Sequence, residues 1–348
     1  MRRTILLMTV MTMAAWPQAK PGTAALEGYD PVLLSEGREE AGDAALSVRR
    51  GRFLYQFANA GTKARFEKEP GRYEIQLDGA CARMGAPTSG NPDTYFVHAG
   101  RIYIFGSSEC YKKFAAAPER FLGEDKGYTP GPRTAEARGQ GERVWQRVRG
   151  AMTGARGAVK SVVELREVKV GPRESTVIQM MVPPATHRNI TRNAQFEFGN
   201  VVTPEGAMQV VRGEGIWLPG SFEAATRAGY GHDLITLLLG GAVEVYAVDE
   251  NTVEVKAEGV WSRVGVNAQT GLVEWLSYRG RGVEGGFEET RVRYSDYRET
   301  AGGKLPFRAD VSVAGDAVPA RGWTVVSYEF NAADIESRLE MPGKVRDF

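Results

Sequence analysis

Two cysteines are the side chains of this sequence best suited to chemistry. Cys81 and Cys110 are the 2 cysteines of the chain, and both lie in its first third. In an oxidising compartment such a pair is most simply a disulfide, which would close a loop of about 30 residues and contribute on the order of 2–4 kcal/mol. The same sulfurs could instead bind a transition metal, zinc or copper, or remain buried thiols that only pack.

A metal site would need more than these two ligands. Zinc sites are tetrahedral, so two thiolates leave half of the coordination to other groups. His98, with a nearby hydroxyl or carboxylate, is the candidate that the sequence offers. Cys110 falls in the first turn of a helix expected from Glu109 to about Ala116, where free backbone amides stabilise a thiolate. That position suits metal ligation and thiol–disulfide exchange equally, so both remain open.

No catalytic motif accompanies the cysteines. The chain lacks a G-x-S-x-G nucleophile motif, an H-E-x-x-H zinc motif and a phosphate-binding loop. Its 3 histidines, His98, His187 and His232, are far apart in the sequence. We therefore expect a binding protein and not an enzyme.

The elements around Cys110 repeat a pattern found earlier in the chain. Val48–Tyr73 and Val97–Leu122 each predict a hairpin with glycine at its turn, followed by a helix that stops before a proline. Five residues of the first segment recur 48 positions later, and the matched pairs are Tyr55 and Tyr103, Phe57 and Phe105, Phe66 and Phe114, Pro70 and Pro118, and Tyr73 and Phe121. Two such copies predict one small domain with two similar halves. Thr62 aligns with Cys110, so the symmetry does not require a thiol there.

Residues 26–123 resemble the YHS domain, a small α+β module often predicted to bind metal. The resemblance rests on Gly28 to Val32, which read GYDPV, and on Tyr103 to Cys110, which read YIFGSSEC. Cys81 matches the other cysteine-bearing segment of that family. Gly106 stands where the metal-binding members carry a first cysteine, so the resemblance implies the fold more strongly than it implies a metal.

The composition is that of an ordinary globular protein. A length of 348 residues predicts two domains, each able to bury its own core. A net charge of +1 gives no reason to expect nucleic acid as a partner. Residues 1–19 read as a signal peptide, because two arginines precede an apolar run too short to cross a bilayer. We expect a periplasmic or secreted protein, and in that compartment a Cys81–Cys110 disulfide is the preferred state of the two sulfurs.

A linker over residues 124–141, rich in glycine and proline, separates the two expected domains. The second domain covers residues 142–345 and begins with a helix at Glu142. Beyond Lys160 the apolar period changes from about 3.6 to 2, and a long series of strands follows. One helix, expected over Phe222–Leu239, interrupts the strands and ends almost wholly in apolar residues. A curved antiparallel sheet with this helix on its concave face would cover that apolar end.

Roughly residues 140 to 345 resemble the outer-membrane lipoprotein carrier (LolA-like) group of half-barrel proteins. The resemblance rests on the Asp233 to Leu239 helix, on Asn267 to Gly271 before a strand, and on Tyr294 to Arg298 followed by Gly303 to Phe307. Such folds enclose an apolar cavity for acyl chains. The resemblance therefore implies a ligand-binding set of three leucines and three tryptophans, namely Leu234, Leu237, Leu238, Trp217, Trp261 and Trp275. The same residues would serve equally well as ordinary core.

The predicted fold class is α+β, with a small two-fold-repeat domain followed by a curved antiparallel half-barrel sheet with helices on its concave face. Two functions compete. The first is an exported carrier that holds a lipid-like or other apolar molecule, with the YHS-like domain as an accessory and a membrane-associated protein as a further candidate partner. The second is a periplasmic metal-handling or thiol-redox accessory protein that uses Cys81 and Cys110. We prefer the first, and a large apolar cavity would favour it.

Overall fold

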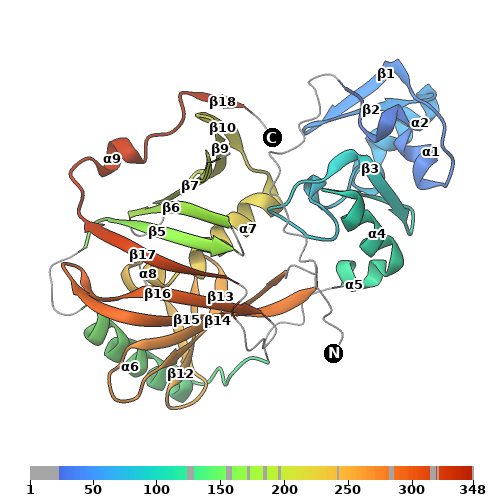
Figure 1. Cartoon of the computed structure of the whole chain (residues 1–348). Helices are drawn as coiled ribbons and strands as arrows, with labels where there is room; N and C mark the ends of the chain where they lie inside the picture. The colour runs from blue at the N-terminus through green and yellow to red at the C-terminus, as the bar shows by residue number, and fades with distance from the viewer. Residues whose placement is uncertain are drawn as a thin grey trace, which may run out of the picture. The chain divides into compact units, whose positions relative to one another are not determined.

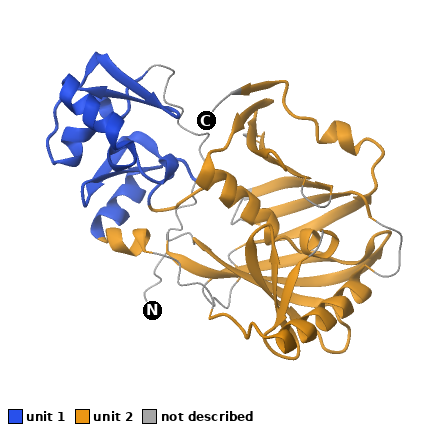
Figure 2. Cartoon of the chain, turned by 180° about the vertical axis from the view of Figure 1, so that it is seen from behind, with its two compact units in different colours: residues 1–82, 88–116 blue, residues 83–87, 117–348 orange. Residues whose placement is uncertain are grey.

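The computed structural model describes residues 23–123, 129–153, 159–170, 173–182, 186–194, 197–240, 243–281, 286–313, 319 and 321–346. The predicted signal peptide lies outside these residues. The chain divides into two compact units (Figure 2). Unit 1 comprises residues 1–82 and 88–116, and unit 2 comprises residues 83–87 and 117–348.

Unit 1 contains two copies of a hairpin followed by a helix, as the repeat predicts. Their bounds are β1 (Asp43–Arg50), β2 (Phe53–Phe57), α2 (Ala60–Lys68) and α3 (Pro70–Tyr73) in the first half, and β3 (Asn91–His98), β4 (Arg101–Phe105) and α4 (Ser108–Ala116) in the second. Asn59 accepts a hydrogen bond from the Thr62 amide at 3.0 Å, and Ser107 accepts one from the Cys110 amide at 3.2 Å. The helices α2 and α4 are therefore capped at equivalent positions.

The repeat begins earlier than its aromatic pattern indicates. Each half opens with a tight turn in left-handed backbone, η1 (Leu26–Gly28) in the first half and η2 (Leu77–Gly79) in the second. The middle residues Glu27 and Asp78 have φ angles of 54° and 52°, a region that few residues other than glycine adopt. The sequence comparison, which relied on aromatic residues, missed this match.

The backbone contacts that follow these turns also match. The amide of Asp30 donates to the Glu40 carbonyl at 2.9 Å, and the amide of Cys81 donates to the Thr88 carbonyl at 2.8 Å. Asp30 is fully buried, and its carboxylate accepts the Ala58 amide at 2.8 Å. Cys81 therefore occupies in the second half the place of a buried carboxylate in the first.

Unit 2 is dominated by one sheet, which has 14 strands within the described residues (Figure 1). Every neighbouring pair is antiparallel except β10 and β18. In sheet order the strands are β11 (Glu244–Ala247), β12 (Thr252–Ala257), β13 (Val260–Val266), β14 (Val273–Arg281), β15 (Phe287–Thr300), β16 (Gly303–Val313), β17 (Arg321–Phe330), β5 (Val162–Val170), β6 (Arg173–Val182), β7 (Thr186–Arg192), β8 (Glu197–Thr203), β9 (Gly206–Val211), β10 (Glu214–Trp217) and β18 (Lys344–Arg346).

The contacts of one helix show that this sheet is curved. Helix α7 (Gly220–Gly231) contacts β8 and β9 and also β13. In the sheet order β8 and β13 are separated by β14, β15, β16, β17, β5, β6 and β7. In a flat sheet that separation would be about 38 Å, at about 4.8 Å for each strand step. A helix of 12 residues is only about 18 Å long. The sheet therefore wraps around α7, as Figure 1 shows.

The helix expected over Phe222–Leu239 is two helices. After α7 the chain breaks at His232 and Asp233, and α8 (Leu234–Leu239) begins. Asp233 caps α8, because its Oδ1 accepts the amides of Ile235 at 2.9 Å and Thr236 at 3.3 Å. A carboxylate that satisfies the first free amides of a helix sets the start of that helix. The apolar periodicity alone did not reveal this break.

Helix α6 (Ala135–Met152) begins seven residues before the predicted start at Glu142. Thr134 caps it by accepting the Ala137 amide at 3.1 Å. The sequence reading assigned Gly141 to the linker, but in the structure this glycine faces β11. A Cβ at Gly141 would lie 2.7 Å from the backbone of β11. The glycine therefore allows close helix–strand packing and does not break the helix.

The core of unit 2 lies between the sheet and the helices α6 and α8. Leu234, Leu237 and Leu238 of α8 are each 2% exposed or less. They pack with apolar residues of α6 and of the strands, among them Val148, Val253, Val264 and Leu276. No helix in the described residues is long and apolar enough to cross a membrane.

Candidate functional site

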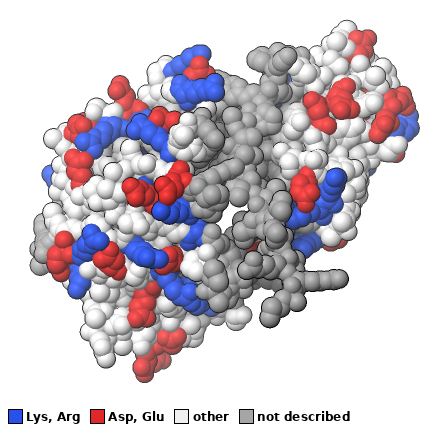
Figure 3. Space-filling model, in the orientation of Figure 1, with Lys and Arg blue, Asp and Glu red and all other residues white. Residues whose placement is uncertain are grey.

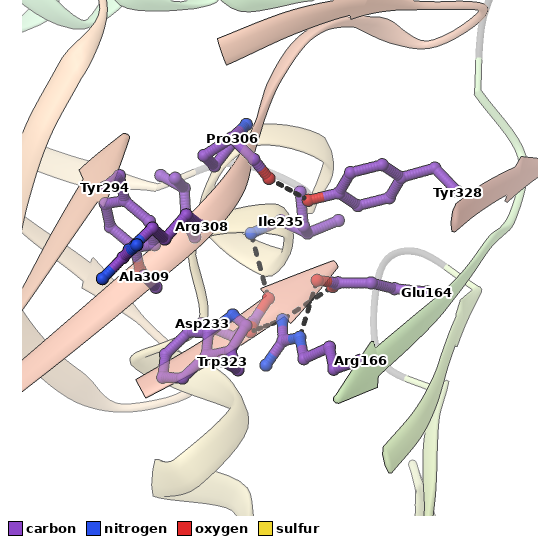
Figure 4. A pocket seen from close by; sticks show the side chains of 11 residues that line it. Glu164, Arg166, Asp233, Ile235, Tyr294, Pro306, Arg308, Ala309, Trp323 and Tyr328 are labelled. Atoms are coloured by element: carbon purple, nitrogen blue, oxygen red, sulfur yellow. Dashed lines mark hydrogen bonds and ion pairs between the residues drawn. The ribbon is translucent and has the colours of Figure 1, made fainter. Parts of the chain in front are cut away.

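A buried ion cluster lies at the start of α8 (Figure 4). Glu164 and Arg166 alternate along β5, so their side chains point to the same face of the sheet. Arg166 donates from Nε and Nη2 to the two carboxylate oxygens of Glu164, both at 2.6 Å. Its Nη2 also donates to Asp233 at 2.9 Å. Glu164 is 3% exposed and Arg166 is 9% exposed, so this pairing occurs almost out of water.

The surroundings of the cluster change its protonation. Burial raises the pKa of Glu164, and the Arg166 guanidinium opposes that change. Burial alone would lower the pKa of Arg166, but the carboxylates of Glu164 and Asp233 raise it well above its ordinary value. The guanidinium also lies 5.0 Å from the centre of the Trp323 ring, which favours the cation. Arg166 is therefore a permanent positive charge.

Two small pockets flank the first turn of α8. The Arg166 pocket has a cavity volume of about 10 Å³, and the residues that line it include Arg166, Leu234, Tyr294, Arg308, Trp323 and Tyr328 together with Glu164, Asp233 and Ile235. The His187 pocket also has a cavity volume of about 10 Å³, and the residues that line it include Gln179, Met181, His187, Tyr230 and Thr236 together with the same Glu164, Asp233 and Ile235. Each holds about one water molecule, far less than the clefts of roughly 300–1,000 Å³ that hold drug-sized ligands. The two pockets thus share the ion cluster as a common wall.

His187 is the second unusual group of this region. It lies on β7, is 1% exposed, and stacks on the ring of Tyr230 with the ring centres 4.5 Å apart. Its Nε2 has no hydrogen-bond partner among the described residues. Burial lowers the pKa of His187 to about 4, so the ring is neutral at pH 7.

The structure brings together only half of the predicted ligand-binding residues. The three leucines lie together in the core beneath α8, and Leu234 also lines the Arg166 pocket. Trp217 is 37% exposed on β10. The Trp261 ring lies 4.3 Å from the Arg133 guanidinium, and the Trp275 ring lies 4.4 Å from that of Arg291. None of the three tryptophans lines either pocket, so the structure places them away from the candidate site.

The predicted metal ligands are not gathered either. His98 pairs with Arg101 at the turn of the β3–β4 hairpin, whereas Cys81 pairs with Ile104 near the other end of β4. Three residues along a strand correspond to about 10 Å. Among the described residues no group of three or more His, Cys, Asp or Glu side chains is placed to hold a metal.

Cys81 and Cys110 are both buried, and the structure contains no bond between their sulfurs, so the predicted disulfide stays a prediction. Cys110 lies in the first turn of α4, as expected. The two sulfurs belong to unit 1 and take no part in the pockets of unit 2.

One serine–histidine pair also occurs in unit 2. His232 Nδ1 lies 2.8 Å from the Ser262 hydroxyl, and the ring of His232 stacks on Tyr278 at 4.2 Å. Ser262 has no exposed surface. A fully buried serine cannot contact a substrate. We therefore assign this pair the structural role of linking the end of α7 to β13.

Sequence reasoning missed Glu164, Arg166 and Asp233. The available signal was the pair Glu164 and Arg166, at alternate positions in the strand SVVELREV and on the same side of it as Val162. In a strand with one buried face, two charges on the same side as Val162 predict a buried pair or a site. Asp233 carried a second signal, since an aspartate before an apolar run is typical of a helix start.

No family model matches the chain, and no curated protein matches it. Two solved structures are similar to it. One is a LolA superfamily protein, NE2245, from Nitrosomonas europaea, with 8% identity over 55% of this chain and 94% of that chain and a TM-score of 0.38. The other is a DUF1329 family protein from Desulfovibrio piger ATCC 29098, with 10% identity over 59% of this chain and 99% of that chain and a TM-score of 0.36. These values are too low to carry a functional inference, so the half-barrel description rests on the sheet order and helix contacts above.

Proposed function

We propose that this chain is an exported binding or carrier protein that holds an apolar molecule inside the curved sheet of unit 2. The observation that carries the proposal is α8. This helix has only 6 residues, is separated from α7 by a capped break, and buries its leucines against the concave face of the sheet. A helix this short has little stability of its own, so its position depends on the packing of those leucines.

The leucine side chains that α8 buries are similar in total size to an acyl chain. Three leucine side chains contain about twelve carbon atoms, and burial is worth roughly 0.8 kcal/mol for each CH₂ group. A ligand tail of similar length can replace their contacts with the sheet at little net cost. Because the pockets beside α8 are small, uptake requires α8 to move away from the core. Binding without catalysis is the activity proposed.

The other parts of the chain are assigned roles under the same proposal. The signal-like segment directs the protein to the periplasm or outside the cell, and a membrane-associated protein delivers or receives the ligand. On the face of unit 2 seen in Figure 3, acidic and basic side chains are intermingled. Exposed ion pairs such as Arg298–Asp296 and Arg308–Asp310 also place the two signs of charge side by side. That mixture does not favour nucleic acid as a partner. Unit 1 is a YHS-like accessory domain.

One observation favours a second function for unit 1. Cys81 and Cys110 stand where the first half has Asp30 and Thr62, so both thiols are specific to the second half. Cys110 lies in the first turn of α4, where the amides favour a thiolate. Thiol exchange or soft-metal binding is the chemistry such a pair offers, with ligands other than His98.

Uptake of a neutral fluorescent probe, N-phenylnaphthylamine, tests the carrier function. Replacing Leu237 and Leu238 with aspartate should abolish the fluorescence increase, because two charges would then face the apolar core. Val326→Asp is the matched control, since Val326 is 50% exposed on β17. It should bind like the wild type. Unchanged uptake by the double variant, with its circular dichroism spectrum preserved, would refute the proposal.

A further inference from the structure

The His187 pocket contains a polar atom that the described part of the chain leaves unsatisfied. Nε2 of His187 is buried without a hydrogen-bond partner in these residues. Burying such an atom unpaired costs about 1–3 kcal/mol. With the proton on Nδ1, Nε2 is a hydrogen-bond acceptor. A ligand that donates a hydrogen bond here would recover that cost.

The charged groups on the wall of this pocket are also acceptors. Glu164 and Asp233 are among the residues that line the pocket. Arg166 bonds both of them, so with both carboxylates ionised the three groups together carry a net charge of −1. Ionised carboxylates accept several hydrogen bonds each, and these contacts leave part of that capacity unused. The pocket therefore combines acceptors with a net negative charge.

We propose that the His187 pocket binds a primary ammonium group, the head of an amphiphilic ligand whose tail enters the core. This inference rests on the proposed carrier function. An ammonium group has three donors and no acceptor, which matches His187, Glu164 and Asp233. Its charge neutralises the cluster. A carboxylate or phosphate head would instead be repelled by the two carboxylates, and it would have to displace one of them from Arg166.

The position of the pocket would also direct the tail of the ligand toward the core. Ile235 and Thr236 line the pocket and belong to the first turn of α8. The hydroxyl of Thr236 lies 3.5 Å from the Met181 sulfur, and both Thr236 and Met181 are buried. A head group held here places the first carbons of its tail beside α8, next to the leucines.

Three probes of equal chain length test the head-group preference. Dodecylamine, dodecanol and dodecanoic acid are each used to displace N-phenylnaphthylamine from the full-length protein. The amine should bind at least about tenfold more tightly than the acid. His187→Phe keeps a ring to stack on Tyr230 but removes the acceptor. It should weaken amine binding by about tenfold and should weaken dodecanol, which has a single hydrogen-bond donor and no charge, by a smaller factor. Equal or tighter binding of the acid, or an amine affinity unchanged in His187→Phe, would overturn the proposal and leave the pocket as a site for water only.

A second readout separates this proposal from the carrier function. The chain has 3 histidines, so the ring resonances in a proton NMR spectrum are few, and His187→Phe identifies one of them. Propylamine, which lacks a tail, should shift that resonance while sodium propionate does not. If propylamine shifts it but no dodecyl compound binds, the head-group site stands and the carrier function fails. If propylamine leaves it unmoved, the head-group site fails.

Discussion

The guanidinium of Arg166 lies 2.9 Å from the carboxylate of Asp233, and this contact joins strand β5 to the first turn of α8. The same Asp233 caps that helix through its other oxygen. One aspartate therefore fixes both where α8 begins and where it lies on the sheet. Because Arg166 also neutralises Glu164, the position of α8 depends on a single buried cation.

Removing the Arg166 cation should lower the free energy of unfolding. Arg166→Met leaves Glu164 and Asp233 buried without their partner, a loss of about 3–5 kcal/mol in the free energy of unfolding. The double variant Glu164→Gln with Arg166→Met should lose less, because one of the stranded charges is then absent. Arg298→Met, at an exposed pair with Asp296, should change stability by about 1 kcal/mol or less. Urea unfolding measures all three, and equal losses at Arg166 and Arg298 would contradict the buried-cluster account.

Stability should depend on pH through His187. Burial lowers the pKa of this histidine from 6.5 to about 4 in the folded chain. The unfolded chain therefore takes up a proton at higher pH than the folded chain does. The contribution of neutral His187 to the free energy of unfolding is fully present above pH 6.5. It is lost as the pH falls to about 4, and the loss is on the order of 3 kcal/mol.

The variant His187→Phe isolates that effect. Burial raises the pKa of Glu164, which acts in the opposite sense, so the wild-type curve alone mixes several groups. The difference in unfolding free energy between the wild type and His187→Phe should change between pH 7 and pH 4 in favour of the variant. A difference that stays constant over this range would show that His187 titrates normally in the folded protein.

Two glycines of α6 should respond in opposite ways to alanine. A Cβ at Gly141 would lie 2.7 Å from the β11 backbone, whereas one at Gly139 would meet only the Arg143 side chain at 3.6 Å. Gly141→Ala should lower the unfolding free energy by about 1–3 kcal/mol through overpacking. Gly139→Ala should raise it by up to about 1 kcal/mol, because alanine favours the helix. Thermal unfolding measures both, and stabilisation by Gly141→Ala would mean that α6 does not pack on β11 as described.

The cysteines predict a specific pattern of thiol reactivity. Cys81 and Cys110 are buried and are not bonded to each other in the structure, so a thiol reagent should label neither in the native protein within minutes. After denaturation without reductant it should label two. Labelling of none would establish the disulfide that the exported compartment favours. Labelling of both in the native protein would show that α4 opens readily.

The helices and strands were easier to predict from the sequence than the residues of the candidate site. The repeat in unit 1 was visible because aromatic spacing and a capping serine, Ser107, are local signals. The early start of α6 was missed because Gly141 reads as a linker residue until β11 is placed against it. The prediction for the tryptophans lacked the same kind of long-range information. Their large apolar rings fit a cavity in principle, but Trp261 lies under Arg133, which is 128 positions earlier in the chain, and Trp275 lies under Arg291 of the neighbouring strand β15. The contact between Arg166 and Asp233 joins residues 67 positions apart, and no local pattern reports such a pairing.

A reversible cross-link between α8 and the sheet tests most directly whether α8 must move for the ligand to enter. Thr236 Oγ1 in α8 lies 3.5 Å from the Met181 sulfur in β6, so a disulfide in the double variant Thr236→Cys with Met181→Cys would join helix and sheet, and its formation under an oxidant is checked by mass. The account predicts that the oxidised double variant takes up no N-phenylnaphthylamine, that dithiothreitol restores uptake, and that each single variant binds throughout. If the oxidised variant, with its cross-link verified by mass, binds the probe as tightly as the reduced one, α8 does not yield to the ligand and the carrier account is wrong.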